Sequence, residues 1–230
     1  ESGSGKTTVA RMIAGLDQPT EGKVLVRGTD ATVQTAAARH ERLETLQMIF
    51  QDPQSALNPR RMVETLLAQA MEADHRDHSK AERAERVTDL LREIGMPAES
   101  RRRFPSQLSG GQRQRINIGR ALCVAPKILI ADEIVSGLDV SVQAQILNLL
   151  LRLREELDIS LLLISHDLSV VRYICSRVLV MHQGYVVESG ATEQIFADPQ
   201  HEYTRALLAA VPPDDASAPW PPKFSEREAG

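Results

Sequence analysis

The sequence has few cysteines, no long apolar run and no large net charge, and each absence excludes a class of protein. Its two cysteines, Cys123 and Cys175, lack the CxxC spacing of metal or redox sites, so we expect buried thiols. No apolar run approaches the roughly 18 residues that cross a bilayer. The 27 basic and 31 acidic side chains leave a net charge of −4, which gives no long-range attraction to nucleic acid or anionic lipid. Any membrane contact is therefore expected to be made through protein.

The second half of the chain alternates short apolar strands with helices. At 230 residues and 42% hydrophobic, the chain can bury one substantial core. Near-continuous apolar strands are typical of a parallel sheet covered on both faces, so we predict an α/β fold with a mainly parallel sheet. The expected strands are 46–50, 128–131, 161–164 and 178–181, with helices at 7–14, 36–44, 112–124, 140–157 and 168–174.

The remaining segments differ in composition. Residues 55–105 are rich in helix formers and charge, and they predict a helical insertion with amphipathic helices over 62–73 and 80–94. A short strand is expected over 22–28 and a small edge strand at 186–187. Helices over 192–197 and 203–210 follow, and the proline-rich stretch 212–230 predicts a disordered tail.

The chain opens with a glycine-rich loop of the kind that binds phosphates. Glu1 to Thr8 supply every position of GxxxxGK[ST] except the first glycine, so we expect a chain truncated within this loop and carrying no signal peptide. The glycine amides approach the β-phosphate, Lys6 adds a positive charge, and Thr7 offers a hydroxyl to Mg²⁺. A threonine-capped turn is the alternative explanation. The expected nucleotide-binding residues are Ser2, Gly3, Ser4, Gly5, Lys6, Thr7 and Thr8.

Polar side chains follow three of the expected strands. Gln51 follows Phe50, Asp132 and Glu133 follow Ala131, and Ser165 and His166 follow Ile164. Because ligands bind at the carboxyl ends of parallel strands, these groups are expected to converge. Asp132 would then hold a magnesium ion, and Glu133 would be free to act as general base. Taken alone, an Asp-Glu pair is also consistent with a turn.

Ser109-Gly110-Gly111-Gln112 begins a helix and has two explanations. Ser-x-x-Gln is a capping box, but capping does not require two glycines in the first turn, where each costs roughly 1 kcal/mol relative to alanine. Glycines there expose amides, which together with the Ser109 hydroxyl form an anion site. Both roles can hold at once.

The glycine-rich loop, Leu108 to Gln112 and the strand 128–133 together resemble the ATPase subunit of an ABC transporter. The resemblance implies a P-loop NTPase (RecA-like) core with an inserted helical subdomain and a C-terminal extension. It also implies catalytic roles for Gln51, Glu133 and His166, and Mg²⁺ bound with the substrate ATP by Thr7, Gln51 and Asp132. The residues implied to contact the ATP of a second subunit are Leu108, Ser109, Gly110, Gly111, Gln112 and Asp139, although Asp139 is also explained as a helix cap.

The same resemblance divides the chain into five parts. They are the N-terminal part of the nucleotide-binding core (1–54), the helical subdomain (55–108), the rest of the core (109–190), the C-terminal helical extension (191–211) and the tail (212–230).

Four further segments, 51–53, 57–60, 140–145 and 203–208, resemble the oligopeptide and dipeptide importers, including their nickel and glutathione relatives. This branch implies ATP-driven uptake of peptides or a related small solute. The implied partners are a second ATPase subunit, permease subunits and, indirectly, an extracytoplasmic solute-binding protein, at the cytoplasmic face of the membrane and without nucleic acid.

Two departures from the pattern are visible. Ile134 stands where the family usually has proline. Isoleucine restores the backbone N–H and frees φ at this position, which is expected to loosen Glu133. Glu202 replaces a proline of the importer branch. The truncated chain itself is expected to bind ATP poorly, because it lacks the loop's first glycine and the strands before it.

Two alternatives remain open. The first is an ABC-type ATPase that acts in DNA repair, chromosome structure or translation, although the chain lacks the zinc-binding cysteines, long coiled coil or second cassette that such proteins carry. The second is a regulatory nucleotide-binding module without hydrolysis.

Overall fold

The computed structural model describes residues 3–33, 35–72 and 79–210, which form two compact units. The larger unit contains residues from 6 to 165, and the smaller contains residues 3–5 and 166–210. The glycine-rich loop is therefore divided between them, with Gly5 in the smaller unit and Lys6 in the larger. The predicted domain boundaries stay a prediction, and the predicted tail lies outside the described residues.

A parallel sheet with the strand order β3-β4-β5 forms the centre of the larger unit. The strands are β3 (Leu46–Ile49), β4 (Ile128–Asp132) and β5 (Ser160–Ile164). Ile49 pairs with Ala131, and Asp132 pairs with Ile164, so the three strands end at one edge. The parallel sheet predicted from the apolar runs is confirmed.

Helix α1 (Lys6–Ala14) packs on β3 and β4. Its apolar side joins a buried cluster whose members are Ala10, Leu46, Ile130 and Ile164, with Ile13, Ala14, Met48, Ile128 and Leu162 packed around them. The first turn of α1 carries no acidic residue. The positive end of the helix dipole is thus not neutralised by its own side chains and favours an anion.

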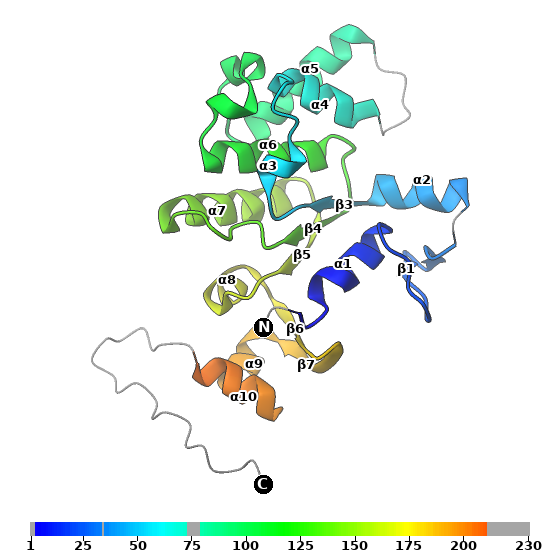
Figure 1. Cartoon of the computed structure of the whole chain (residues 1–230), viewed down its shortest axis with the longest axis vertical. Helices are drawn as coiled ribbons and strands as arrows, with labels where there is room; N and C mark the ends of the chain where they lie inside the picture. Colours follow the sequence, from blue (N-terminus) through cyan, green and yellow to red (C-terminus); the bar gives the residue numbers. More distant parts are fainter. Residues whose placement is uncertain (1–2, 34, 73–78, 211–230) are drawn as a thin grey trace. The chain divides into compact units, whose positions relative to one another are not determined.

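The helical layer of this unit lies between β3 and β4 in the sequence. It comprises α3 (Pro53–Ala56), α4 (Val63–Met71), α5 (Lys80–Glu93), the 3-10 turns η2 (Ala98–Arg102) and η3 (Pro105–Gln107), and α6 (Gly110–Leu122). Figure 1 shows α4 and α5 gathered over α6, in agreement with their contacts. Their amphipathic faces bury residues such as Leu67, Leu90 and Ile116 completely. The predicted pair of amphipathic helices is confirmed.

Three further segments complete the larger unit. Helix α7 (Val140–Glu156) packs against α6, and α2 (Ala36–Thr45) leads directly into β3. The predicted strand 22–28 is a two-stranded antiparallel hairpin instead, β1 (Leu25–Val26) with β2 (Thr29–Asp30). Arg27 and Gly28 both have positive φ, of 52° and 84°, which is the geometry of a two-residue turn.

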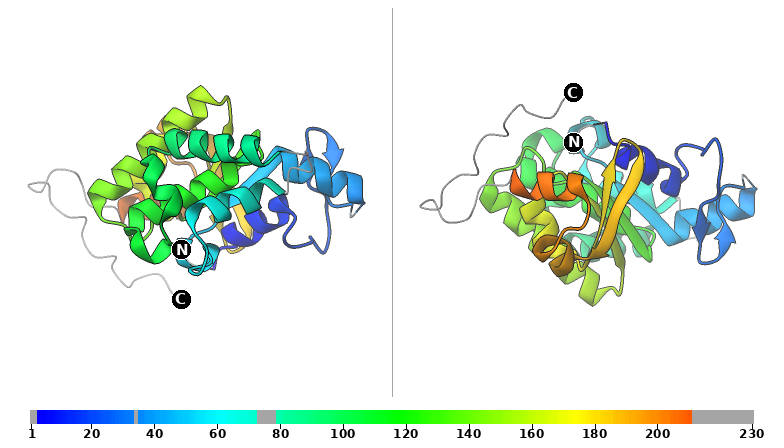
Figure 2. Two further views of the ribbon diagram at one scale, coloured as in Figure 1. Left: turned by 90° about the horizontal axis from the view of Figure 1, so that it is seen from above. Right: turned by 90° about the horizontal axis from the view of Figure 1, so that it is seen from below.

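The smaller unit contains α8 (Leu168–Ile174), an antiparallel hairpin of β6 (Arg177–His182) and β7 (Tyr185–Ala191), α9 (Thr192–Ala197) and α10 (Glu202–Ala209). Figure 2, in its right-hand view, shows the hairpin in yellow, and α9 contacts both of its strands. β7 is longer than the predicted edge strand. Gln183 and Gly184, with φ of 48° and 84°, close the hairpin, so β6 pairs with β7 in antiparallel fashion and does not extend a parallel pattern.

The prediction of two buried thiols is confirmed for one cysteine and wrong for the other. Cys123 is buried, but Cys175 is only half-buried, and neither of them forms a disulfide. His182 stacks on Tyr203 with ring centroids 3.9 Å apart, and His201 Nδ1 accepts the Tyr203 N–H at 3.1 Å. Among the described residues, no helix has the length and apolar character to span a membrane.

Candidate functional site

Thr7 and Asp132 meet at the edge of the sheet where the strands end. Thr7, in the first turn of α1, donates its hydroxyl to Asp132 Oδ1 over 3.2 Å, although 125 positions separate the two residues. The packing of α1 on β3 and β4 brings them together. A hydroxyl from the phosphate loop and a carboxylate from the strand end therefore share one location.

Gln51 and Glu133 form a second contact at the same edge. Gln51, just after β3, donates its side-chain amide to Glu133 Oε2 over 3.0 Å. Thr7, Gln51, Asp132 and Glu133 are named the strand-end cluster below. The structure thus brings together side chains from three separate segments, as the strand-end rule predicts.

The backbone of Glu133 is left-handed, with φ of 49°. Its N–H donates to Ile164 O over 3.0 Å, and its carbonyl accepts the Ser136 N–H over 3.0 Å. A non-glycine residue in this region costs on the order of 1–3 kcal/mol and persists only where its surroundings impose it. The neighbouring strand and turn impose it here.

Ile134 follows Glu133 and is 1% exposed. Its side chain is held in the core. Burial therefore restricts the movement of this residue, although the ring of a proline is not there to fix its backbone. The effect of this isoleucine on turnover stays a prediction.

The Asp132 carboxyl is 4% exposed, and its pKa is raised. Burial is the main cause, and the charge of Glu133 adds to it, whereas the Thr7 hydroxyl and the charge of Lys6 lower the pKa. A carboxylate withdrawn from water gains from a cation. Together with the Thr7 hydroxyl and the Gln51 side-chain oxygen, it offers the hard oxygen ligands that Mg²⁺ takes when substrate phosphates complete its shell. The donor set therefore fits magnesium.

The remaining loop residues are divided by the boundary between the units. In the smaller unit, Gly3 and Gly5 have φ of 89° and 91°, a conformation that favours glycine, and Ser4 O accepts the Gly184 N–H over 3.2 Å. Lys6 and Thr8 belong to α1 in the larger unit. His166 lies in the smaller unit, and Ser2 lies outside the described residues. The roles of all these residues stay predictions.

Ser109 to Gln112, named the signature turn below, begins α6. Ser109 Oγ accepts the Gln112 N–H over 3.3 Å, and Gln112 Oε1 accepts the Ser109 N–H over 3.0 Å. The predicted capping box is confirmed. Leu108, just before the turn, is buried and accepts a hydrogen bond from the Arg113 guanidinium over 2.7 Å.

The two glycines of the signature turn differ in their surroundings. A Cβ at Gly110 would lie 3.6 Å from Leu138 Cδ2, an ordinary contact, whereas a Cβ at Gly111 would lie 2.5 Å from Val142 Cγ1. The close approach of α6 and α7 therefore explains the glycine at position 111, whether or not a ligand binds there.

Asp139 stands at the N-cap position of α7 but makes no side-chain capping bond. Its backbone carbonyl accepts the Gln143 N–H over 2.8 Å. The helix-cap explanation therefore accounts for the position of Asp139 and not for its carboxylate.

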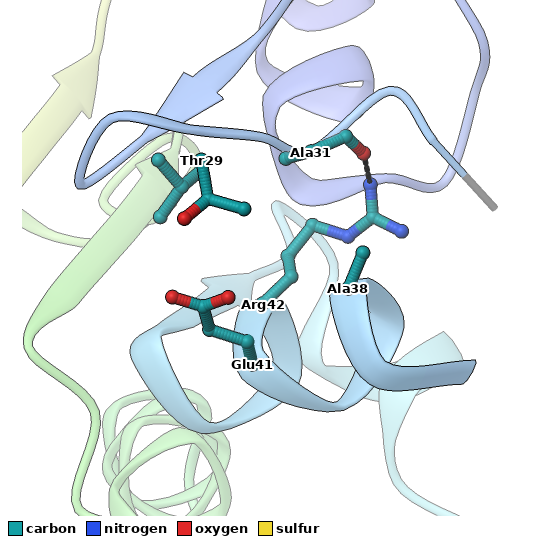
Figure 3. Close-up of a pocket in the computed structure, with 6 residues that line it drawn as sticks. Thr29, Ala31, Ala38, Glu41 and Arg42 are labelled. Carbon is teal, nitrogen blue, oxygen red and sulfur yellow. Dashed lines mark hydrogen bonds between the residues drawn. The ribbon is translucent and has the colours of Figure 1, made fainter. Parts of the chain in front are cut away.

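A small cavity lies away from these residues. It measures about 10 Å³, is surrounded by Val26, Thr29, Ala31, Ala38, Glu41 and Arg42, and includes the bond from Arg42 to Ala31 O, 2.6 Å long (Figure 3). This volume holds about one water molecule. The cavity is thus excluded as a nucleotide site. Among the described residues, no three His, Cys, Asp or Glu side chains are grouped as metal ligands.

Sequence reasoning missed three polar side chains of α6. Gln114 and Asn117 are buried, and Asn117 donates to Phe50 O over 3.1 Å. Arg120 donates to Ala56 O. The available signal was the i, i+3 and i+6 spacing of these polar residues, which places them along one side of the helix but does not identify their partners.

Two family models match the chain. The model described as "ABC transporter" matches residues 1–136, and the model described as "Oligopeptide/dipeptide transporter, C-terminal region" matches residues 187–228. The first covers more than half of the chain.

Curated relatives match almost the whole chain. A probable peptide ABC transporter ATP-binding protein, y4tS, of Sinorhizobium fredii is 50% identical over 95% of the chain and 62% of its own length. The oligopeptide transport ATP-binding protein AmiF of Streptococcus pneumoniae is 45% identical over 94% of the chain and 70% of its own. The dipeptide transport ATP-binding protein DppF of Haemophilus influenzae is 43% identical over 92% and 64%. The chain therefore spans about two thirds of these relatives.

Solved structures agree with this assignment. A dimeric, post-hydrolysis structure of the ATP-binding cassette MJ0796 with ADP and Pi is 29% identical, with a TM-score of 0.74 over 84% of this chain and 82% of that one. CbiO1 of Clostridium perfringens, part of the ABC transporter complex cbiONQ, is 28% identical, with a TM-score of 0.76 over 86% and 77%.

Proposed function

The chain belongs to the ABC transporter family, in its oligopeptide and dipeptide branch, and we propose that it binds and hydrolyses ATP to power uptake of peptides or a related small solute. Its fold is that of an ATP-binding cassette with a parallel sheet. The observation that carries the proposal is the strand-end cluster, in which a loop hydroxyl, a buried carboxylate, a second carboxylate and an amide converge.

The binding role is assigned to the loop and the start of α1. The amides of Gly3 and Gly5, the charge of Lys6 and the helix N-terminus favour the phosphates of ATP. Thr7, Asp132 and Gln51 would hold Mg²⁺, whose charge offsets that of the phosphates. The raised pKa of Asp132 supports this assignment, since a bound cation offsets the cost of burying its charge.

The chemical role is assigned to Glu133, which orients the attacking water and takes its proton. The Gln51 amide now bonded to Glu133 Oε2 is released when the carboxylate turns to water. His166 is assigned to the γ-phosphate, through the hydrogen bond that its imidazole donates.

The signature turn is assigned to the ATP of a second copy or a homologous subunit. An anion site at the start of α6 is formed by the N–H groups of Gly110 and Gly111 and the Ser109 hydroxyl. Asp139, whose carboxylate makes no capping hydrogen bond, stands at the start of the adjoining helix α7. The dimeric relative MJ0796 supports such pairing. Permease subunits and, indirectly, an extracytoplasmic solute-binding protein complete the proposed complex, at the cytoplasmic face of the membrane. The match over residues 187–228 favours this importer over a DNA-repair or translation factor.

The test is Glu133→Gln in the full-length protein. We expect ATP turnover to fall by about 10²–10⁴-fold, the usual contribution of general-base catalysis, while ATP now holds a dimer together. Turnover is measured by phosphate release and the dimer by size-exclusion chromatography with ATP. Glu85→Gln, a change on the exposed side of α5, is the matched control and should behave as wild type. Normal turnover by Glu133→Gln would refute the assignment.

A further inference from the structure

The segment that carries Gln51 is tied to α6 at both of its ends. Asn117 donates its side-chain amide to Phe50 O over 3.1 Å, at the start of the segment. Arg120, one turn further along α6, donates to Ala56 O, at its end. Figure 1 shows α3, the helical part of this segment, against α6. The seven residues 50–56, named the glutamine segment, are thus attached to one face of one helix.

Both attachments are costly to break. Asn117 is 3% exposed, so an amide that lost Phe50 O would be left unpaired away from water. The Arg120 guanidinium is half-buried, and burial lowers its pKa, as expected for a charge that has lost part of its hydration. A guanidinium in that position depends on the carbonyl that it bonds.

The glutamine segment is also held together internally. Asp52 caps α3, and its carboxylate accepts the N–H groups of Gln54 and Ser55 over 2.8 and 3.2 Å. The pKa of Asp52 is lowered, mainly by the Gln54 N–H, and the charge of Arg113 on α6 contributes. A short capped segment with two fixed ends moves as one piece with the helix that holds it.

We propose that Asn117 and Arg120 are positioning residues that clamp the glutamine segment to α6, so that the contact of Gln51 with Glu133 follows the position of the signature turn. The inference rests on the proposed function of the strand-end cluster. It follows the course of α6, which is capped by Ser109 and carries Asn117 two turns later. Two hydrogen bonds complete the connection, from Asn117 to Phe50 O and from Gln51 to Glu133. The signature turn of one subunit would thereby act on the catalytic carboxylate of the same subunit.

The kinetic test compares Asn117→Asp and Arg120→Gln with wild type in the full-length protein. Each removes a bond to the glutamine segment, and we expect kcat to fall by about tenfold while KM for ATP changes by less than about twofold, since the phosphate loop is untouched. In Arg120→Lys, which keeps a charged hydrogen-bond donor, kcat should fall less than in Arg120→Gln. On a Gln51→Ala background, both changes should add nothing, because the residue that they position is gone.

Arg115→Gln is the matched control. Arg115 lies on the same helix and also donates to a backbone carbonyl, Ile94 O, over 2.8 Å, but it holds α5 instead of the glutamine segment. Its loss should leave kcat unchanged.

Hydrogen exchange of the nucleotide-free protein gives a readout that needs no activity. In Asn117→Asp and Arg120→Gln, the amides of residues 54–56 should exchange about tenfold faster than in wild type, and in Arg115→Gln they should not. If Arg120→Gln does not fold, Arg120→Lys carries the same comparison. Unchanged exchange in both clamp variants, or full additivity with Gln51→Ala, would overturn the clamp. A wild-type protein without ATPase activity would instead overturn the proposed function, and exchange would still decide the clamp.

Discussion

The strand-end cluster and the signature turn belong to the same unit and are held in opposite ways. Thr7 and Asp132 are 125 positions apart, and Gln51 and Glu133 are 82 apart, so their contacts exist only once α1 and the sheet have assembled. Ser109 and Gln112 are three positions apart and bond each other within one helical turn. The site proposed for catalysis depends on tertiary structure, whereas the site proposed for a second subunit is largely local. Variants at the two places should therefore differ in how function and stability change together.

The largest expected effect is at Asp132, where function and stability should move in opposite directions. Asp132→Asn keeps the shape but removes the charge that the ion needs, so turnover should fall by about 100-fold or more. The same change removes a negative charge whose burial destabilises the folded protein. The Tm of the nucleotide-free protein should therefore rise by roughly 2–4 °C, if about 1 kcal/mol of unfolding free energy is regained. Phosphate release and thermal unfolding measure the two effects.

The pH dependence of that stability gain follows from the raised pKa. A carboxyl whose pKa is raised by folding contributes stability below its unfolded pKa, and this contribution is lost as the pH rises through the folded value. The advantage of Asp132→Asn over wild type should therefore be greatest at neutral pH and shrink as the pH falls into the acidic range. Thermal unfolding at several pH values decides this, and a gain that grows on acidification would contradict it.

The second effect, at Gly111, should follow from packing alone. Gly111→Ala places a methyl group where Val142 Cγ1 already lies, and such overpacking costs about 1–3 kcal/mol. Gly111→Ala/Val142→Ala makes room for the added methyl group and should recover part of the unfolding free energy. Gly110→Ala, which meets only an ordinary contact with Leu138, is the control. Denaturant unfolding measures all three, and equal losses at the two glycines would count against the close approach.

The smallest effect, at Ser109, separates capping from ligand binding. Ser109→Ala removes a helix cap and should cost about 1 kcal/mol of unfolding free energy. Ser79→Ala is the matched variant, because Ser79 forms the same capping box with Glu82 at the start of α5. Both should lose similar stability, but Ser109→Ala alone should weaken ATP-dependent dimerisation. Equal dimerisation of the two variants would leave Ser109 with only the capping role.

The sequence predicts those parts of the molecule that local rules govern. The capping box at Ser109 follows from spacing, and the convergence of Gln51, Asp132 and Glu133 follows from the rule that parallel strands end at one edge. The contact of Gly111 with Val142 and the bonds of Asn117 and Arg120 follow from how closely α6 approaches its neighbours. No periodicity in the sequence encodes that distance, so only the structure reveals these contacts. The hairpin of β1 and β2 was missed because its strands are too short for an alternating pattern.

The left-handed backbone at Glu133 sets folding against chemistry at a single residue. Glycine or asparagine adopts this conformation more easily than glutamate, so either would relax the end of β4 and leave no carboxylate there. Variants of this protein selected only for heat resistance should therefore accumulate glycine or asparagine at position 133 and lose ATP turnover. Selection for thermostability has to be combined with selection for turnover.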